Sequence, residues 1–388
     1  MVKPGYKQTE IGVIPEDWEI SSLAKEYDLF AGGDLDVSDY SVVKTTTHKY
    51  CILSNGLADN GVYGFCSNPK YYGNSITITG RGDIGHCVYR AEPFSAIIRL
   101  LVCQPRSNII SKYVSDYLTC AKPFIFESTG VPQLTVPQIK NTRFPKPPVA
   151  EQRYIAEALS DVDELISSLE KLIAKKKAIK QGAMEQLLTG KTRLPGFSGE
   201  WRVCSVDDIA EFCTATVPTE LTSIRHYIGT DNMISNKGGV QNNEIAIAYT
   251  AVREYRVNDI LLSNIRPYLK KIWLADRSGG CSNDVLVIRA KGTETITPSF
   301  LYYLLSQDCF FEEVMANAVG TKMPRGDKAV IMAYHIQIPQ EVKEQHTIVD
   351  MLNEIDNDID YLDKKLAKIR CIKQGMMQQL LTGKVRLV

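Results

Sequence analysis

Two stretches of the chain carry the same helical spacing of apolar residues. In the first, apolar side chains recur at alternating steps of four and three from Ile155 to Leu187, with two lysines interrupting the series. In the second, the same spacing runs from Ile348 to Leu380. A 3.5-residue repeat kept over about five heptads is typical of a coiled-coil seam. We therefore predict two long helices, each about 57 Å long if roughly 38 residues rise about 1.5 Å each.

The two stretches are one segment that occurs twice. Residues 151–194 and 344–387 align without a gap, and 23 of the 44 aligned positions are identical. The match is densest near the end of each copy, where both read Gln-Leu-Leu-Thr-Gly-Lys. Gly190 and Gly383 follow the last apolar seam residue of each copy, so we expect them to end the helices.

Charge is divided along both predicted helices. Residues 151–170 hold six acids and one base, whereas 171–191 hold six bases and one acid. Residues 344–363 hold seven acids and no Lys or Arg, and 364–384 hold six bases and no acid. An antiparallel pair brings each acidic half against a basic half, so we predict that arrangement. The lysine cluster at 175–180 also suits the helix dipole, with contact to a DNA backbone as the alternative.

The regions outside the helices show strand patterns. Runs rich in β-branched and other apolar residues are broken by Gly, Pro and Asn, which indicates mixed α/β domains with substantial sheet. The strand patterns fall at 75–79, 96–102, 259–263 and 284–289. The predicted organisation is domain 1–150, helix 151–194, domain 195–343 and helix 344–388.

Polar, basic turns follow these strands in both domains. Turns of this kind let a backbone approach phosphates, while Arg can reach guanine and Gln or Asn can reach adenine. The alternative is an ordinary turn whose Gly and Pro only redirect the chain, and sheet packing would equally explain the tyrosines near Lys70. The candidate DNA-binding residues are Lys70, Tyr72, Arg81, Gln133, Arg266, Tyr268, Lys270, Lys322 and Arg325.

Composition and short motifs exclude several kinds of site and segment. The 45 basic and 45 acidic residues give zero formal net charge, so any basic surface must be local. Ten cysteines without a CxxC pair and five scattered histidines provide no zinc pattern. Gly190-Lys191-Thr192 lacks the upstream glycine of a phosphate loop. No run of about 18–20 apolar residues and no apolar signal core occur, so we expect a cytoplasmic protein without a membrane span.

Methyl-transfer chemistry is also missing from the sequence. A methyltransferase for exocyclic amines needs an (Asn/Asp/Ser)-Pro-Pro-aromatic loop to hold a flipped base. Asn68-Pro69-Lys70-Tyr71 comes nearest and lacks the second proline, so we interpret it as a turn. The sequence therefore predicts a chain that is not itself an enzyme.

The order of the segments resembles the specificity subunit of type I restriction-modification systems. The resemblance spans nearly the whole chain: a variable block, a helix that begins Glu-Gln and ends Gln-Leu-Leu-Thr-Gly-Lys, a second block and the repeated helix. Thr-Glu-Ile-Gly-Val-Ile-Pro-Glu-Asp-Trp at 9–18 and Leu-Pro-Gly-Phe at 194–197 add to it.

This resemblance implies the partners of the chain. Each variable block would be a target recognition domain that reads half of a bipartite double-stranded DNA sequence, with the helices as spacer. Two DNA-adenine methyltransferase subunits would dock on the chain, joined in the full complex by restriction subunits with motor and nuclease activity. The chain would hold no cofactor, and S-adenosylmethionine is expected on the methyltransferase.

Antiparallel helices agree with that assignment. They would place the two unlike blocks with pseudo-twofold symmetry, so the target would be two dissimilar half-sites at a separation set by helix length. Two alternatives stay open: a coiled-coil scaffold whose blocks bind protein or small ligands, and a self-sufficient methyltransferase.

Overall fold

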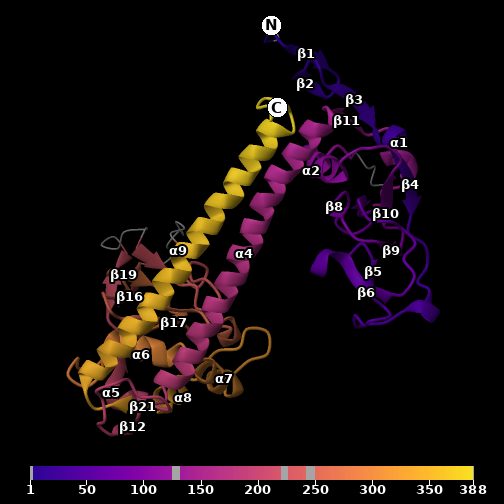
Figure 1. The fold of residues 1–388 in the computed structure, drawn as a ribbon. Helices are drawn as coiled ribbons and strands as arrows, with labels where there is room; N and C mark the ends of the chain where they lie inside the picture. Colours follow the sequence, from indigo (N-terminus) through magenta and orange to yellow (C-terminus); the bar gives the residue numbers. More distant parts are fainter. Residues whose placement is uncertain (1–2, 125–131, 220–225, 242–249, 388) are drawn as a thin grey trace. The chain divides into compact units, whose positions relative to one another are not determined.

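The chain forms two compact units in a computed structural model (Figure 1). The first unit consists of Met1–Glu170 and Lys364–Val388, and the second is the continuous stretch Lys171–Asp363. Each unit thus contains one half of each long helix, α4 (Val149–Leu187) and α9 (Val342–Leu380). The structure describes residues 3–124, 132–219, 226–241 and 250–387.

Both predicted helices are confirmed, and each is 39 residues long. The predicted seam is the buried face of each helix, since Ile155 and Leu352 are fully excluded from solvent. Gly190 and Gly383 lie three residues beyond the helix ends with φ of +67° and +69°. This left-handed conformation is the usual way for a glycine to end a helix.

In the first unit the acidic start of α4 runs antiparallel to the basic end of α9. Asp163 pairs with Lys373 at 2.5 Å, and Glu170 pairs with Arg370 at 2.6 Å. As the residue number rises along α4, the number of its partner falls along α9. The direction predicted from the charges is therefore confirmed in this unit.

The second unit contains the complementary halves with the same direction. Lys176 pairs with Asp358 at 2.7 Å, and Lys180 pairs with Asp356 at 2.5 Å. The lysine cluster of α4 thus faces carboxylates of α9. This role differs from the two interpretations given for the cluster in the sequence analysis, the helix dipole and contact with a DNA backbone. Exposed pairs of this kind add little stability singly, but they select the antiparallel alignment over the parallel one.

A buried ion-pair cluster marks the start of each long helix. In the first unit, Arg386 donates to both carboxylate oxygens of Glu151 at 2.6 and 2.9 Å, while the indole N–H of Trp18 donates to Glu151 at 3.0 Å. Arg386 also binds Asp17 at 2.7 Å and lies over the Trp18 ring. The two carboxylates raise the pKa of Arg386, and its hydrogen bonds lower the pKa of Asp17.

The second unit repeats the arginine–glutamate pair and the arginine–tryptophan contact of this cluster, whereas the indole N–H of Trp201 has no hydrogen-bond partner among the described residues. Arg193 donates to Glu344 at 2.7 and 2.8 Å and lies over the ring of Trp201. A Cβ on Gly190 would lie 3.1 Å from that ring, so a side chain here would press on the tryptophan. In both units, therefore, the end of one repeat copy closes over the start of the other.

The first unit builds its sheets around this framework. A four-stranded antiparallel sheet has the order β4-β10-β7-β8, a smaller sheet has the order β6-β5-β9, and α2 packs on β7 and β8. The elements are β1 (Tyr6–Thr9), β2 (Gly12–Pro15), β3 (Glu19–Ser22), α1 (Leu23–Glu26), β4 (Tyr27–Ala31), η1 (Val37–Asp39), β5 (Tyr50–Leu53), η2 (Ala58–Gly61), β6 (Val62–Cys66), β7 (Ser75–Ile78), β8 (Cys87–Arg90), β9 (Phe94–Ala96), β10 (Leu101–Pro105), α2 (Ser111–Ala121), α3 (Val136–Ile139) and β11 (Arg143–Lys146).

The second unit repeats the plan with different residues. Its main sheet has the order β13-β20-β17-β18, a second sheet has the order β14-β16-β19-β15, and β12 pairs with β21 as β3 pairs with β11. The elements are β12 (Trp201–Ser205), α5 (Val206–Ile209), β13 (Ala210–Phe212), β14 (Thr216–Pro218), β15 (Tyr227–Ile228), β16 (Ala251–Tyr255), β17 (Ile260–Ser263), η5 (Pro267–Leu269), β18 (Ile272–Leu274), β19 (Gly279–Cys281), β20 (Val285–Ala290), α6 (Pro298–Leu305), α7 (Asp308–Ala316), α8 (Lys328–Ala333) and β21 (His335–Pro339). The predicted mixed α/β class is confirmed in both units.

One predicted strand is wrong. The apolar run at 96–102 is not a single strand, because β9 ends at Ala96 and β10 begins at Leu101. Between them, Ile98 and Arg99 are left-handed, with φ of 53° and 59°. An apolar run reports burial but not chain direction, so it did not reveal this turn.

A buried carboxylate should make the first unit sensitive to acid. Glu26 is 2% exposed and accepts hydrogen bonds from Lys146 at 2.8 Å, from Ser107 and from Ser21. Burial alone would raise the pKa of Glu26, but these bonds outweigh it and hold the pKa at about 2. Because this folded-state pKa is depressed, the stabilisation is present above about pH 4.5 and is lost as the pH falls toward 2.

We therefore expect Glu26→Gln to remove roughly 3 kcal/mol from the free energy of unfolding at pH 7, with the difference from wild type vanishing near pH 2. Urea unfolding of the first unit at a series of pH values measures both curves. Glu19→Gln, an exposed carboxyl on β3, is the control and should run parallel to wild type. A Glu26→Gln curve that also stays parallel would contradict the assignment.

Candidate nucleic-acid interface

In the first unit, two predicted DNA-binding residues meet at the end of β7. Arg81 follows this strand and donates from Nη2 to Oε1 of Gln133 at 3.3 Å. The backbones also join, because the N–H of Leu134 donates to the carbonyl of Gly80 at 2.8 Å. Arg81 is half-buried, and its Nε has no hydrogen-bond partner among the described residues. Gln133 and Leu134 belong to the closing turn of the first domain, at 128–134, and its residues 128–131 lie outside the described residues.

Sequence reasoning missed a second basic residue near this turn. The N–H of Gly80 donates to Asn55 Oδ1 at 2.8 Å, and Asn55 Nδ2 donates to the carbonyl of Ile98 at 2.6 Å. A Cβ on Gly80 would lie 3.1 Å from the carbonyl oxygen of Arg99, which is exposed. The backbone of Arg99 therefore lies close to that of Gly80, the residue before Arg81. The apolar residues around Arg99 predicted a strand, so the turn that exposes Arg99 was not recognised.

Lys70 and Tyr72 do not join this group. Both precede β7, whereas Arg81 follows it, so they lie at opposite ends of the strand. Tyr71, between them, pairs with Phe94 through backbone hydrogen bonds of 2.9 and 3.0 Å. Tyr72 is 76% exposed and Lys70 is exposed. They belong to a different part of the surface of the first unit.

The second unit brings its corresponding turns together in the same way. The N–H of Arg266 donates to the carbonyl of Pro324 at 2.7 Å, and the N–H of Gly326 donates to the carbonyl of Asn264 at 3.0 Å. Arg266 is left-handed with φ of 51°, and its side chain is exposed. Tyr268, in η5, is 52% exposed. The basic turn after β17 and the closing turn at 319–325 thus form one loop pair, as in the first unit.

Carboxylates already engage two of the predicted cations in the second unit. Arg325 pairs with Asp284 at 2.9 Å, although both groups stay partly exposed. Lys270 and Lys237 both bind Oδ1 of Asp308, at 2.8 and 2.7 Å, and hydrogen bonds from the two lysines lower the pKa of Asp308. Lys270 therefore has a structural role in holding η5 to α7. Arg266, Tyr268 and Lys322 stay exposed.

Comparison with known proteins assigns the fold and the role. Residues 15–181 and 198–370 each match the family described as type I restriction modification DNA specificity domain. The chain belongs to this family. Its role is therefore DNA sequence specificity, and the two matched segments account for the two repeats of the fold.

Relatives of the whole length support the assignment. The chain is 26% identical over 408 residues to the type I restriction enzyme MjaVIII specificity subunit of Methanocaldococcus jannaschii, covering 96% of this chain and 94% of the relative. The fold is similar to the crystal structure of the type I restriction-modification S subunit from M. genitalium, with a TM-score of 0.65 at 15% identity over 94% of this chain and 96% of that one. A chain from a structural study of assembly in a type I system matches with a TM-score of 0.54 at 12% identity, covering 96% of this chain and 99% of that one.

Two further observations concern the described residues alone. Within them, no group of three or more His, Cys, Asp or Glu side chains is arranged to hold a metal ion. A separate search of the same residues found no helix with the length and apolarity to cross a bilayer.

Proposed function

We propose that each unit of this specificity subunit reads one half of a bipartite DNA sequence through its loop pair. The observation that carries the proposal is that both units build the same loop pair with different side chains. The first presents Arg81 and Gln133, and the second presents Arg266 and Arg325. Arg bonds well to guanine and Gln to adenine, so unlike side chains on a shared framework would select unlike half-sites.

Partners would carry the chemistry. In this proposal two DNA-adenine methyltransferase subunits dock on the chain, hold S-adenosylmethionine and flip the target base, and restriction subunits add cleavage in the full complex. A solved chain of similar fold comes from a study of complex assembly in a type I system, which supports the view that such subunits work in assemblies.

The two long helices would set the separation of the half-sites. They contribute 39 residues each, and ion pairs between acidic and basic halves hold them in register in both units. A helix pair of fixed length is a stiff element, so the gap between half-sites should be constant for this chain.

Selection from a duplex pool tests the function. The chain, with its methyltransferase, is incubated with random bipartite duplexes, and the bound fraction is sequenced at a stated salt concentration. Two short dissimilar sequences at one fixed gap support the proposal. An unenriched pool would favour the coiled-coil scaffold, and methyl-donor-dependent methylation by the chain alone would show that it is itself an enzyme.

Single arginines should affect one half-site each. Arg81→Ala should relax the half-site read by the first unit and Arg266→Ala the other, with about 1–3 kcal/mol of discrimination lost at the contacted base. Competition binding with single-base variants of the selected duplex measures this loss. Arg153→Ala and Arg202→Ala remove exposed arginines elsewhere in the two units and should leave both half-sites unchanged. Equal weakening on every sequence would assign Arg81 or Arg266 to phosphates instead.

A further inference from the structure

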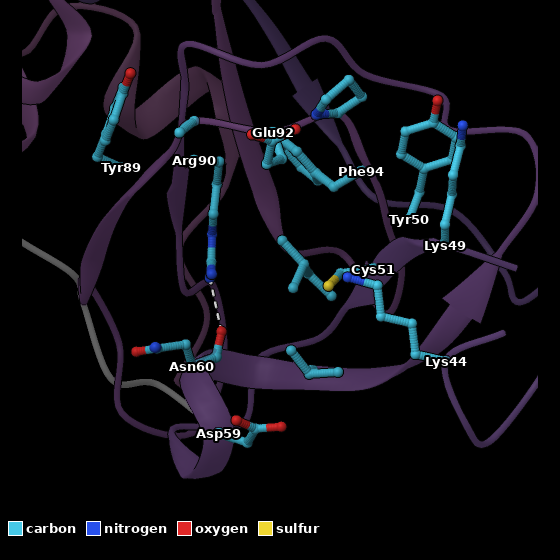
Figure 2. Close-up of a pocket in the computed structure, with 14 residues that line it drawn as sticks. Lys44, Lys49, Tyr50, Cys51, Asp59, Asn60, Tyr89, Arg90, Glu92 and Phe94 are labelled. Atoms are coloured by element: carbon cyan, nitrogen blue, oxygen red, sulfur yellow. Dashed lines mark hydrogen bonds between the residues drawn. The ribbon is translucent and has the colours of Figure 1, made fainter. Parts of the chain in front are cut away.

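A groove of about 760 Å³ opens in the first unit, away from the loop pair. It lies between β5, the end of β8 and the loop η2 (Figure 2). Its lining is mixed: aromatic and aliphatic side chains form the walls, while Arg90, Lys44 and Lys49 supply positive charge. A volume in this range suits a small organic ligand or a short stretch of a polymer.

Arg90 contributes the deepest charge of the groove. Its Nε donates to Thr77 Oγ1 at 2.9 Å. Its Nη2 donates to the carbonyl of Asn60 at 2.8 Å, the bond drawn in Figure 2. Neither partner is charged, and no carboxylate among the described residues lies within ion-pair distance of Arg90. Burial lowers the pKa of this guanidinium to about 10. Three of its five N–H groups remain for a further acceptor.

The loop that holds Arg90 is strained. Asp59 and Asn60 are both left-handed, with φ of 48° and 52°. Gly61 follows with φ of 82°, and a Cβ there would lie 2.8 Å from the carbonyl oxygen of Ser54. Consecutive non-glycine residues in this conformation cost stability, and such strain concentrates at ligand-binding positions. Here it presents the Asn60 carbonyl to Arg90 and fixes the guanidinium at the groove.

Charge at the rim favours an anion. Lys44 points into the groove, and Lys49 lies over the ring of Tyr50 at 5.1 Å from its centroid (Figure 2). With Arg90 these lysines make three cations against two lining carboxylates, Asp59 and Glu92.

We propose that this groove binds a phosphate ester, with Arg90 as the anchoring donor and Lys44 and Lys49 as flanking cations. Arginine and lysine recognise phosphate oxygens through charge-assisted hydrogen bonds, which are stronger than neutral ones. The phosphate can belong to a DNA backbone or to a free nucleotide. The DNA source rests on the proposed function, whereas the nucleotide source does not.

The test uses the full chain with Lys44 and Lys49 both replaced by alanine. The control replaces Lys25 and Lys140, two exposed lysines of the same unit that do not line the groove, so both double variants lose two charges. Arg90→Ala is a poorer probe because it also removes the bonds to Thr77 and Asn60. Binding to a mixed-sequence duplex and to ATP is measured across a range of salt concentrations.

Each outcome decides the proposal. If DNA is the source, the groove variant alone makes the slope of log affinity against log salt shallower by about two, on every duplex sequence. If a nucleotide is the source, the groove variant alone loses about tenfold in ATP affinity and binds duplex as before. A groove variant that matches the control with both probes overturns the proposal. A wild-type chain that binds ATP through the groove but binds no duplex would contradict the proposed function, while the proposal that the groove binds a phosphate ester would stand.

Discussion

Arg386→Ala is expected to lower the free energy of unfolding of the first unit by about 3–5 kcal/mol. The substitution leaves the carboxylate of Glu151, which is 2% exposed, with the Trp18 indole N–H as its one remaining donor among the described residues. Breaking one side of a buried ion pair costs far more than the pair itself is worth, because the remaining charge stays desolvated. Urea unfolding combined with segment-resolved hydrogen exchange measures the loss in each unit.

Two control variants make this expectation specific. Arg370→Ala removes an exposed partner of Glu170 in the same unit and should cost about 0–1 kcal/mol. Arg193→Ala removes the corresponding arginine of the second unit, so its loss of protection should fall in 171–363 instead. Equal losses for Arg386→Ala and Arg370→Ala would show that the buried cluster does not stabilise the helix start.

Insertion of one heptad into both long helices should lengthen the gap between the two half-sites by about three base pairs. Seven residues add about 10.5 Å of helix, and DNA rises about 3.4 Å per base pair. Placing the insertions after Glu170 and after Asp363 puts them where the two units divide, which preserves the ion pairs within each unit. Selection from pools with variable gaps reads the result directly.

Both half-site sequences should survive that insertion, with weaker binding. Three base pairs turn the duplex by roughly 100° at about 10.5 base pairs per turn, while a heptad keeps the helix seam in phase. The control inserts the heptad into α4 alone, which leaves the interhelical ion pairs on one side of the insertion in register, shifts those on the other side out of register and should abolish selective binding. An unchanged gap in the doubly extended chain would refute the role of the helices as spacer.

The sequence predicted the long helices and their direction because both follow from local repetition. The seam is a simple period, and division of charge between the halves leaves only one favourable alignment. It also singled out polar, basic turns in each domain, but it did not predict that two of these turns pair. That pairing, through Arg81 with Gln133 and through Arg266 with the backbone at Pro324, comes from the structure.

What the sequence did not predict depends on backbone conformation and on distant partners. The left-handed turn at Ile98 and Arg99 leaves no mark in the apolar pattern, so Arg99 was missed. Lys270 resembled a free cation until Asp308, 38 positions away, was found beside it. Tyr72 lies nine positions from Arg81, yet a strand separates them.

The division of the chain also sets an order of completion during synthesis. Residues 171–363 form the second unit as one uninterrupted stretch, so that unit can close as soon as it has left the ribosome. The first unit must wait for the segment 364–387, which brings Arg386 to Glu151. Until then the core around the start of α4 lacks Leu380 and Leu381, two of its buried residues. The recognition domain that is translated first is thus the one that finishes folding last, and it is the half of a nascent chain most in need of protection from aggregation.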